Sequence, residues 1–336
     1  MQVDWRAFQS AAGAHLDGDS VRDYGKPEQE AAAIDANVIT DLSFLSVVRI
    51  TGKDATDFLH GQFTTDIAQL GSGVAQLSAW CNPRGQVVVN FIITRHGDEF
   101  LLLLPHELKD AFLRRLRLYI LRAAVTVEDC DSTKQCIGVR YVMPGTASDM
   151  WDRAVFEDNL VTLPVPGTTD RWIHCGTVPV LIELWQRHVR HCTAIGSHAW
   201  HLFDILAGLP WITAATSETC LPQLLNLDEL GGLSYRKGCF PGQEIIARLH
   251  YRGKVGQRLF LARLDSATAI QPGVRIHAVN TPHAVGTVIN SVMHPRRGLY
   301  ALVTLEIDHL HPDRLRLADS TARFTEVSPP AYLTLP

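Results

Sequence analysis

One cysteine of this chain stands in a setting that favours thiol chemistry. Cys239 lies in the segment YRKGCFPGQEIIAR, two residues after Lys237 and three after Arg236. Pro241-Gly242 fits the two central positions of a type II turn, and the residues from Gln243 onward have helical spacing. Cationic neighbours and a helix N-terminus both stabilise a thiolate. The pattern therefore predicts a reactive Cys239; a buried cysteine in a tight turn is the other interpretation.

Basic residues surround this cysteine. They are Arg236, Lys237, Arg248, Arg252, Lys254 and Arg258. In a chain with 31 Lys+Arg against 35 Asp+Glu, such a local excess indicates an anionic ligand, because arginine binds carboxylate or phosphate in a bidentate way. For any single one of these residues, a solvated charged surface is the alternative. On the helix that follows the turn, we expect Ile245, Ile246 and Leu249 to face the interior.

Other patterns of chemistry-bearing residues are weaker. The remaining six cysteines are dispersed and form no CxxC pair, so we expect reduced, packed thiols. The segment 188–201 contains four histidines and Cys192, but it has no HExxH or paired CxxC spacing, so we predict no metal site. The chain also lacks a P-loop, a GxSxG motif and a Rossmann GxGxxG motif.

Composition bounds the class of protein. The chain has 336 residues, 46% of them hydrophobic, and a formal net charge of −4. This excludes wholesale disorder and the global basic field of a dedicated nucleic-acid binder. No apolar run approaches the roughly 18–20 residues of a membrane span, and the start MQVDWRAFQS does not resemble a signal peptide. We expect a cytoplasmic protein with no membrane contact and no direct nucleic-acid partner.

The elements that must position Cys239 follow an α+β order. After a lead-in of about 35 residues that looks irregular, the sequence predicts strands at 44–51, 86–94, 100–105 and 124–129 and helices at 54–61 and 108–122. The strand–strand–helix–strand order that this contains favours a layered α+β fold over a doubly wound parallel sheet.

A second α+β unit and an all-β unit follow. Strands are predicted at 136–142, 160–165 and 178–185, and a helix runs from Ser197 to Gly208. From Val255 onward, five short strands at regular spacing predict a small β-barrel or sandwich. We place the domain boundaries after residues 140 and 252.

The segment KGCFPGQEIIAR allows a more specific prediction of fold and function. It closely resembles the signature of the YgfZ family of folate-binding proteins, which are relatives of the glycine cleavage T-protein, an aminomethyltransferase. Three more stretches agree in the family's order: FLHGQFTTDI (58–67), GLPWI (208–212) and LPQLLNLDELGGLSYRKGC (221–239). The resemblance covers roughly residues 38–310.

This resemblance implies a fold and a function. The implied fold is a three-domain, T-protein-like ring, with α+β folate-binding domains at 1–140 and 141–252, the second ending in the KGCFPGQE motif, and a C-terminal β-barrel domain at 253–336. The implied cofactor is tetrahydrofolate or another reduced folate, bound in a central channel. The implied role is accessory, in assembly or repair of iron–sulfur clusters, and it supports cluster enzymes that modify tRNA. Partners would be iron–sulfur enzymes or cluster-assembly proteins, and we expect a monomer.

The resemblance also assigns residues. Cys239 is the functional residue, in the catalytic position, and Arg248 is a partner for a folate carboxylate. The expected cofactor-binding residues are Lys237, Gly238, Gln243, Glu244, Arg248 and Asn226.

One departure separates this chain from the T-protein enzymes. In T-proteins, the strand after the first glycine-containing turn carries adjacent acids, one of which assists methylene transfer. Here the matching strand NPRGQVVVNFII has Val89 and Asn90 at those places, and neither side chain can transfer a proton. We therefore expect a folate-dependent accessory factor. An aminomethyltransferase-like enzyme is the alternative, and a scaffold without folate or thiol chemistry is the third possibility.

Overall fold

The computed structural model describes residues 4–142, 153–253, 255–318 and 320–334. These residues form two compact units. Unit 1 takes residues from the ranges 1–58, 69–76 and 92–200, and unit 2 takes residues from 59–68, 77–91 and 201–336. The three-domain division stays a prediction.

Most of residues 5–35 lie in helices and strands, so the expectation of an irregular lead-in was wrong. Its elements are α1 (Trp5–Ala11), β1 (His15–Asp17), β2 (Ser20–Asp23), α2 (Pro27–Ala32) and the 3-10 turn η1 (Ala33–Asp35). The physical reason is Trp5, which is 3% exposed, donates from Nε1 to Asp41 Oδ1 at 2.7 Å and packs edge-on against Trp185. The prediction relied on the polar composition of this segment and missed the few apolar side chains that enter the core of unit 1.

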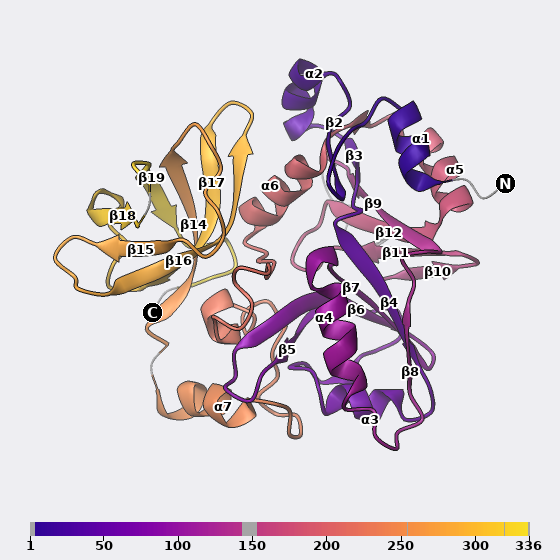
Figure 1. The fold of residues 1–336 in the computed structure, drawn as a ribbon, viewed down its shortest axis with the longest axis horizontal. Coiled ribbons are helices and arrows are strands. Elements are labelled where there is room, and N and C mark those ends of the chain that lie inside the picture. Colours follow the sequence, from indigo (N-terminus) through magenta and orange to yellow (C-terminus); the bar gives the residue numbers. More distant parts are fainter. Residues whose placement is uncertain (1–3, 143–152, 254, 319, 335–336) are drawn as a thin grey trace. The chain divides into compact units, whose positions relative to one another are not determined.

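A six-stranded sheet forms one layer of unit 1 (Figure 1). The strand order is β10-β11-β12-β9-β3-β13, in which β13 runs parallel to β3 and the other pairs are antiparallel. The strands are β3 (Val38–Asp41), β9 (Lys134–Arg140), β10 (Val155–Glu157), β11 (Leu160–Pro164), β12 (Arg171–Thr177) and β13 (Thr193–Ala194).

Helix α5 (Val178–His188) packs on β9 and β12, where we had predicted a strand over 178–185. The apolar run VPVLIELW fits both element types. Pro179 occupies the first turn, where a missing N–H costs no helical hydrogen bond, and Leu181 and Trp185 are buried one turn apart. The helical spacing of these two core residues decides the structure.

A five-stranded sheet has the order β5-β6-β7-β4-β8. Its strands are β4 (Leu45–Thr51), β5 (Ala75–Cys81), β6 (Val87–His96), β7 (Glu99–Pro105) and β8 (Thr126–Asp129). The predicted strands and both predicted helices are confirmed, with α3 at Ala55–His60 and α4 at His106–Arg117; α4 ends earlier than we expected. Leu108, Phe112 and Leu116 of α4 are buried against β4 and β7.

The C-terminal part of unit 2 is a curled, antiparallel half-barrel, drawn in orange to yellow in Figure 1. Its order is β18-β15-β16-β17-β14-β19, and the alternate residues Phe260, Ala262 and Leu264 of β14 lie in its core. The strands are β14 (Gln257–Asp265), β15 (Arg275–Ala278), β16 (Ala284–His294), β17 (Gly298–Glu306), β18 (Leu315–Leu317) and β19 (Arg323–Ser328).

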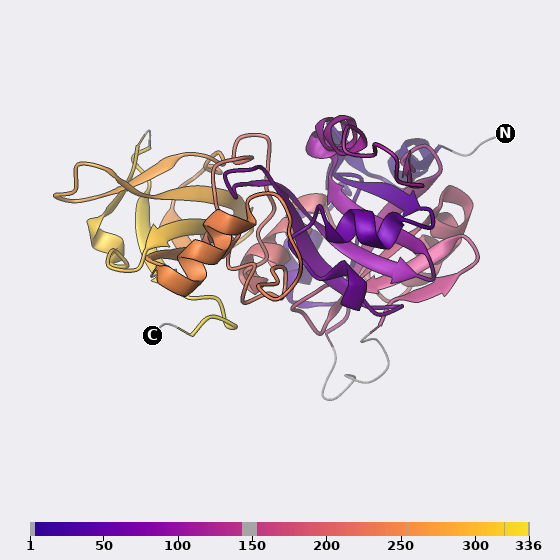
Figure 2. The ribbon, with the colours of Figure 1, turned by 90° about the horizontal axis from the view of Figure 1, so that it is seen from below.

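Short helices precede this sheet in the chain. They are α6 (Ser197–Ala207), η3 (Pro222–Leu225) and α7 (Gln243–Arg252). Two further 3-10 turns are η2 (Ile67–Gln69), which follows α3, and η4 (Pro312–Arg314), which connects β17 to β18. Helix α7 is the orange helix of Figure 2, and it directly follows the segment that carries Cys239.

Unit 1 buries one histidine in its neutral form. His174 of β12 is 8% exposed, and its Nδ1 lies 2.8 Å from Thr162 Oγ1. Burial, with a smaller contribution from His188, lowers the pKa of His174 to about 3. In the unfolded chain the pKa of histidine is about 6.5. The unfolded state therefore binds this proton first as the pH falls.

Acid should destabilise the chain through His174. The contribution of neutral, buried His174 to the free energy of unfolding is complete above a pH of about 6.5 and is lost progressively toward pH 3. Between pH 6.5 and 4, the wild-type chain should lose about 3 kcal/mol of its free energy of unfolding through His174. His174→Gln should not show this loss. Urea denaturation across this range measures the difference, and the exposed His198→Gln serves as control. Parallel pH profiles for wild type and His174→Gln would contradict the assignment.

Candidate functional site

A buried lysine fixes the Cys239 loop within unit 2. Lys237 is 6% exposed, and its Nζ donates short hydrogen bonds to the carbonyl oxygens of His60 and Phe63. The same ammonium group lies 4.9 Å from the centroid of the Phe240 ring. Burial lowers the pKa of Lys237 to about 8, and the negative charge of Asp66 opposes this shift. Lys237 thus anchors the loop; its predicted contact with a cofactor stays a prediction.

The predicted type II turn is confirmed. The N–H of Gln243 donates to the Phe240 carbonyl at 3.1 Å, and Gly242 has φ 79° and ψ 2°. A Cβ on Gly242 would stand 2.4 Å from the Cα of Gly85. Only glycine satisfies both the positive φ and this close approach. Gln243 Nε2 also reaches the Lys237 carbonyl at 3.4 Å, so the turn and the anchor are joined.

Exposure separates Cys239 from the other six cysteines. Cys239 is exposed, whereas the other six are buried free thiols. Desolvation by burial raises the pKa of Cys130 to about 11 and also raises the pKa of Cys81. Buried thiols of this kind are poor nucleophiles and are hard for reagents to reach. Cys239 is the thiol that a partner in solution can meet.

An imidazole–carboxylate pair lies beside the loop, and the sequence reasoning assigned no role to it. His60 ends α3, and its Nδ1 is 3.2 Å from Asp66 Oδ1 and 3.4 Å from the Ala68 N–H. A Cβ on Gly238 would stand 3.6 Å from His60 Nε2, so the ring lies against the backbone that leads to Cys239. The available signal was that both side chains belong to FLHGQFTTDI, one of the stretches that carries the family resemblance.

The predicted basic cluster separates into different environments. Arg258 is paired, since its NH1 lies 2.7 Å from Asp228 Oδ1 and its NH2 lies 3.6 Å from Glu229 Oε1. Lys254 lies outside the described residues. The other members, apart from the buried lysine described above, are exposed arginines: Arg236, Arg248 and Arg252.

Only part of the expected apolar face of α7 is buried. Ile246 is buried and Leu249 half-buried, but Ile245 is 44% exposed, which corrects the expectation that all three face inward. Adjacent helical residues point about 100° apart, so Ile245 and Ile246 cannot share one narrow contact. Glu244 is exposed in the first helical turn, where its negative charge suits the helix dipole.

Two asparagines of unit 2 hold backbone segments together. Asn226 is buried at φ 56°, donates from Nδ2 to the Leu259 carbonyl at 3.0 Å and accepts from the Leu259 N–H at 3.1 Å. Asn90, also buried, donates to the Pro210 carbonyl at 2.8 Å and accepts from the Ile212 N–H at 2.8 Å. Both amides are therefore engaged in structural contacts. The cofactor contact predicted for Asn226 stays a prediction.

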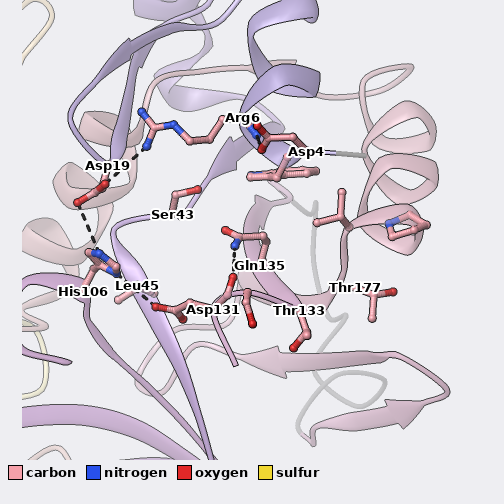
Figure 3. Close-up of a pocket in the computed structure, with 14 residues that line it drawn as sticks. Asp4, Arg6, Asp19, Ser43, Leu45, His106, Asp131, Thr133, Gln135 and Thr177 are labelled. Carbon is pink, nitrogen blue, oxygen red and sulfur yellow. Dashed lines mark hydrogen bonds and ion pairs between the residues drawn. The ribbon is translucent and has the colours of Figure 1, made fainter. Parts of the chain in front are cut away.

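A separate cavity of about 780 Å³ lies in unit 1 (Figure 3). Figure 3 shows Asp19 between Arg6 and His106, at 3.5 Å and 3.7 Å. Asp131 accepts from Ser46 Oγ and from the Lys109 ammonium group, each at 2.7 Å. Protein donors already engage these carboxylates, and none of the predicted site residues lines the cavity.

Two further findings concern the described residues alone. They contain no group of three or more His, Cys, Asp or Glu side chains that could hold a metal ion. Their helices include none with the length and apolar character that spanning a membrane requires.

Comparison with known proteins identifies the family. The model of the GCVT N-terminal domain matches residues 19–140. The tRNA-modifying protein YgfZ of Cronobacter sakazakii is 28% identical over 301 residues, which are 84% of this chain and 89% of that protein. The YgfZ protein of an Enterobacter species is 31% identical over 216 residues, 62% of this chain and 66% of that protein. The chain belongs to the YgfZ family.

The fold of this YgfZ-family member matches that of a T-protein. The crystal structure of glycine cleavage system aminomethyltransferase T from Bartonella henselae aligns with a TM-score of 0.80 over 99% of this chain and 98% of that one. At 14% sequence identity, this likeness shows the fold alone. It confirms the predicted T-protein-like α+β class.

The Lys237 anchor makes a direct prediction about stability. Lys237→Met keeps the apolar stem but leaves one buried and one part-buried carbonyl group without their donor, so the free energy of unfolding should fall by about 2 kcal/mol. Urea denaturation at neutral pH measures the change. The control is Arg236→Met at the adjacent exposed position, which should leave stability nearly unchanged. If Lys237→Met and Arg236→Met had the same free energy of unfolding, the two hydrogen bonds of Lys237 would not hold the loop.

Proposed function

We propose that this chain binds tetrahydrofolate, or another reduced folate, and serves as an accessory factor in iron–sulfur cluster assembly or repair. Its clients would be iron–sulfur enzymes or cluster-assembly proteins in the cytoplasm, including enzymes that modify tRNA. The observation that carries this proposal is the exposed thiol of Cys239, presented by an anchored loop in the segment KGCFPGQE.

Folate binding is supported by the family and by charge. The GCVT N-terminal domain belongs to a folate-binding family, and residues 19–140 match its model. Reduced folate carries a glutamate tail with two carboxylates. Arg248 is exposed on α7, six residues after Gly242 of the type II turn, and a guanidinium group binds a carboxylate in a bidentate way. We propose Arg248 as the partner of this tail, with Gln243 and Glu244 beside it.

The thiol supports the role in cluster chemistry. An accessible thiolate is suited to redox exchange and to transient contact with iron or persulfide sulfur, whereas a buried thiol is suited to none of these. The relatives from Cronobacter sakazakii and Enterobacter are named tRNA-modifying proteins. An accessory role toward cluster-containing tRNA-modifying enzymes agrees with those names without requiring this chain to touch RNA.

Aminomethyl transfer is the alternative function, and the T-protein-like fold favours it. The buried pair Val89 and Asn90 weighs against it, because the nitrogen and the oxygen of the Asn90 amide already bind backbone atoms and valine has no ionisable proton. An assay of folate-dependent ammonia release from an aminomethylated carrier protein separates the two. Turnover above the uncatalysed background would favour the enzyme.

Tetrahydrofolate should bind with a dissociation constant in the micromolar range, and added salt should weaken binding because the arginine contact is exposed. Arg248→Ala should lower the affinity about tenfold, which corresponds to about 1.4 kcal/mol. Isothermal titration calorimetry measures both effects. Arg297→Ala, an exposed arginine between β16 and β17, is the control with the same charge change. Unchanged binding by Arg248→Ala would remove that residue from the site.

Cys239→Ser should separate stability from function. Serine is close to cysteine in size and the side chain is exposed, so the thermal midpoint and folate affinity should stay nearly unchanged. The variant should nevertheless fail to restore iron–sulfur enzyme activity in a bacterial strain that lacks its own family member, whereas the wild-type chain restores it. Full restoration by the serine variant would refute a thiol-dependent role.

A further inference from the structure

Among the described residues of unit 2, three arginine side chains near Cys239 have no partner, in contrast to the Lys237 anchor and the ion pairs of Arg258. In the part of the chain that the structure describes, the guanidinium groups of Arg236, Arg248 and Arg252 have neither a hydrogen bond nor an ion pair. Arg258, by contrast, is engaged by Asp228 and Glu229. The three unpaired groups are therefore available to an anionic ligand.

These arginines belong to one surface. Arg248 and Arg252 are four residues apart on α7, so they lie on the same side of the helix, one turn from each other. The ring of Tyr235 stacks on that of His250, with centroids 3.7 Å apart and an interplanar angle of 13°. This stack holds the segment that contains Arg236 alongside the last turn of α7.

The same surface also carries acidic residues and exposed apolar area. Glu244 lies four residues before Arg248 on α7, while the carboxylates of Asp228 and Glu229 already face Arg258. Tyr251 is 66% exposed between the two helical arginines. Positive charge thus exceeds negative charge here, although the whole chain has a formal charge of −4.

We propose that Arg236, Arg248 and Arg252 bind the poly-γ-glutamyl chain of a polyglutamylated reduced folate. This inference rests on the proposed folate binding and names the form of folate. A monoglutamate tail has two carboxylates, and each added γ-glutamyl residue supplies one more. Three unpaired guanidinium groups exceed what a monoglutamate can satisfy, and a row of carboxylates on a flexible chain can meet them in succession.

Calorimetric titration with tetrahydrofolate in its monoglutamate and pentaglutamate forms tests this. Exposed ion pairs are individually weak, so several together should give the pentaglutamate an advantage of about tenfold at low salt. The double variant Arg236→Gln/Arg252→Gln should lose most of this advantage and keep its affinity for the monoglutamate. The matched control is Arg297→Gln/Arg323→Gln, which removes two exposed charges from the half-barrel and should retain the advantage.

Equal affinity of the wild-type chain for both forms would overturn the inference and leave folate binding intact. An advantage that survives in the double variant would also overturn it, because these arginines would then not carry the contact. Binding of neither form would refute the proposed folate function itself. A short poly-uridine RNA that binds the wild type but not the double variant, with no preference between the two folates, would assign the surface to nucleic acid and overturn the proposal.

Discussion

The buried ammonium group of Lys237 is the contact on which the geometry of the site depends. A lysine in the interior is costly, and the lowering of its pKa to about 8 reflects that desolvation. Two carbonyl oxygens, from His60 and Phe63, offset the cost and join the loop to the end of α3. Because Lys237 points inward, Gly238 lies against His60 and Cys239 is left at the surface.

Other buried polar contacts extend this constraint through unit 2. The close approach of Gly242 to Gly85 fixes the turn after Cys239, and Asn90 and Asn226 each hold a backbone segment through both atoms of the amide group. Buried amides with both groups satisfied rigidify a loop-rich region, since losing either partner leaves an unpaired polar group. Asn90, which lies on β6, is thus a structural link between this strand and the backbone at Pro210 and Ile212.

Local patterns predicted much of the fold, and long-range packing explains the rest. Alternation and turn residues located β4, β6, β7 and the strands of the half-barrel, and Pro241-Gly242 predicted its turn type correctly. The sequence misled us where a local pattern was ambiguous, as in the apolar run that forms α5. Trp5 shows the second cause: its core partners lie far away in the chain, at Asp41 and Trp185. The site follows the same rule, because Lys237 and Phe63 are 174 positions apart, so a lysine beside a cysteine suggested an exposed cation where the structure has a buried anchor.

Brief alkylation of the native chain by iodoacetamide, followed by mass spectrometry of its peptides, tests most directly whether the Lys237 anchor presents one functional thiol. The account predicts that Cys239 is modified first and that the six buried cysteines react only after denaturation. Cys239→Ser should then show almost no rapid labelling in the folded state. Modification that spares Cys239, or that spreads over the buried cysteines at the same rate, would contradict the account.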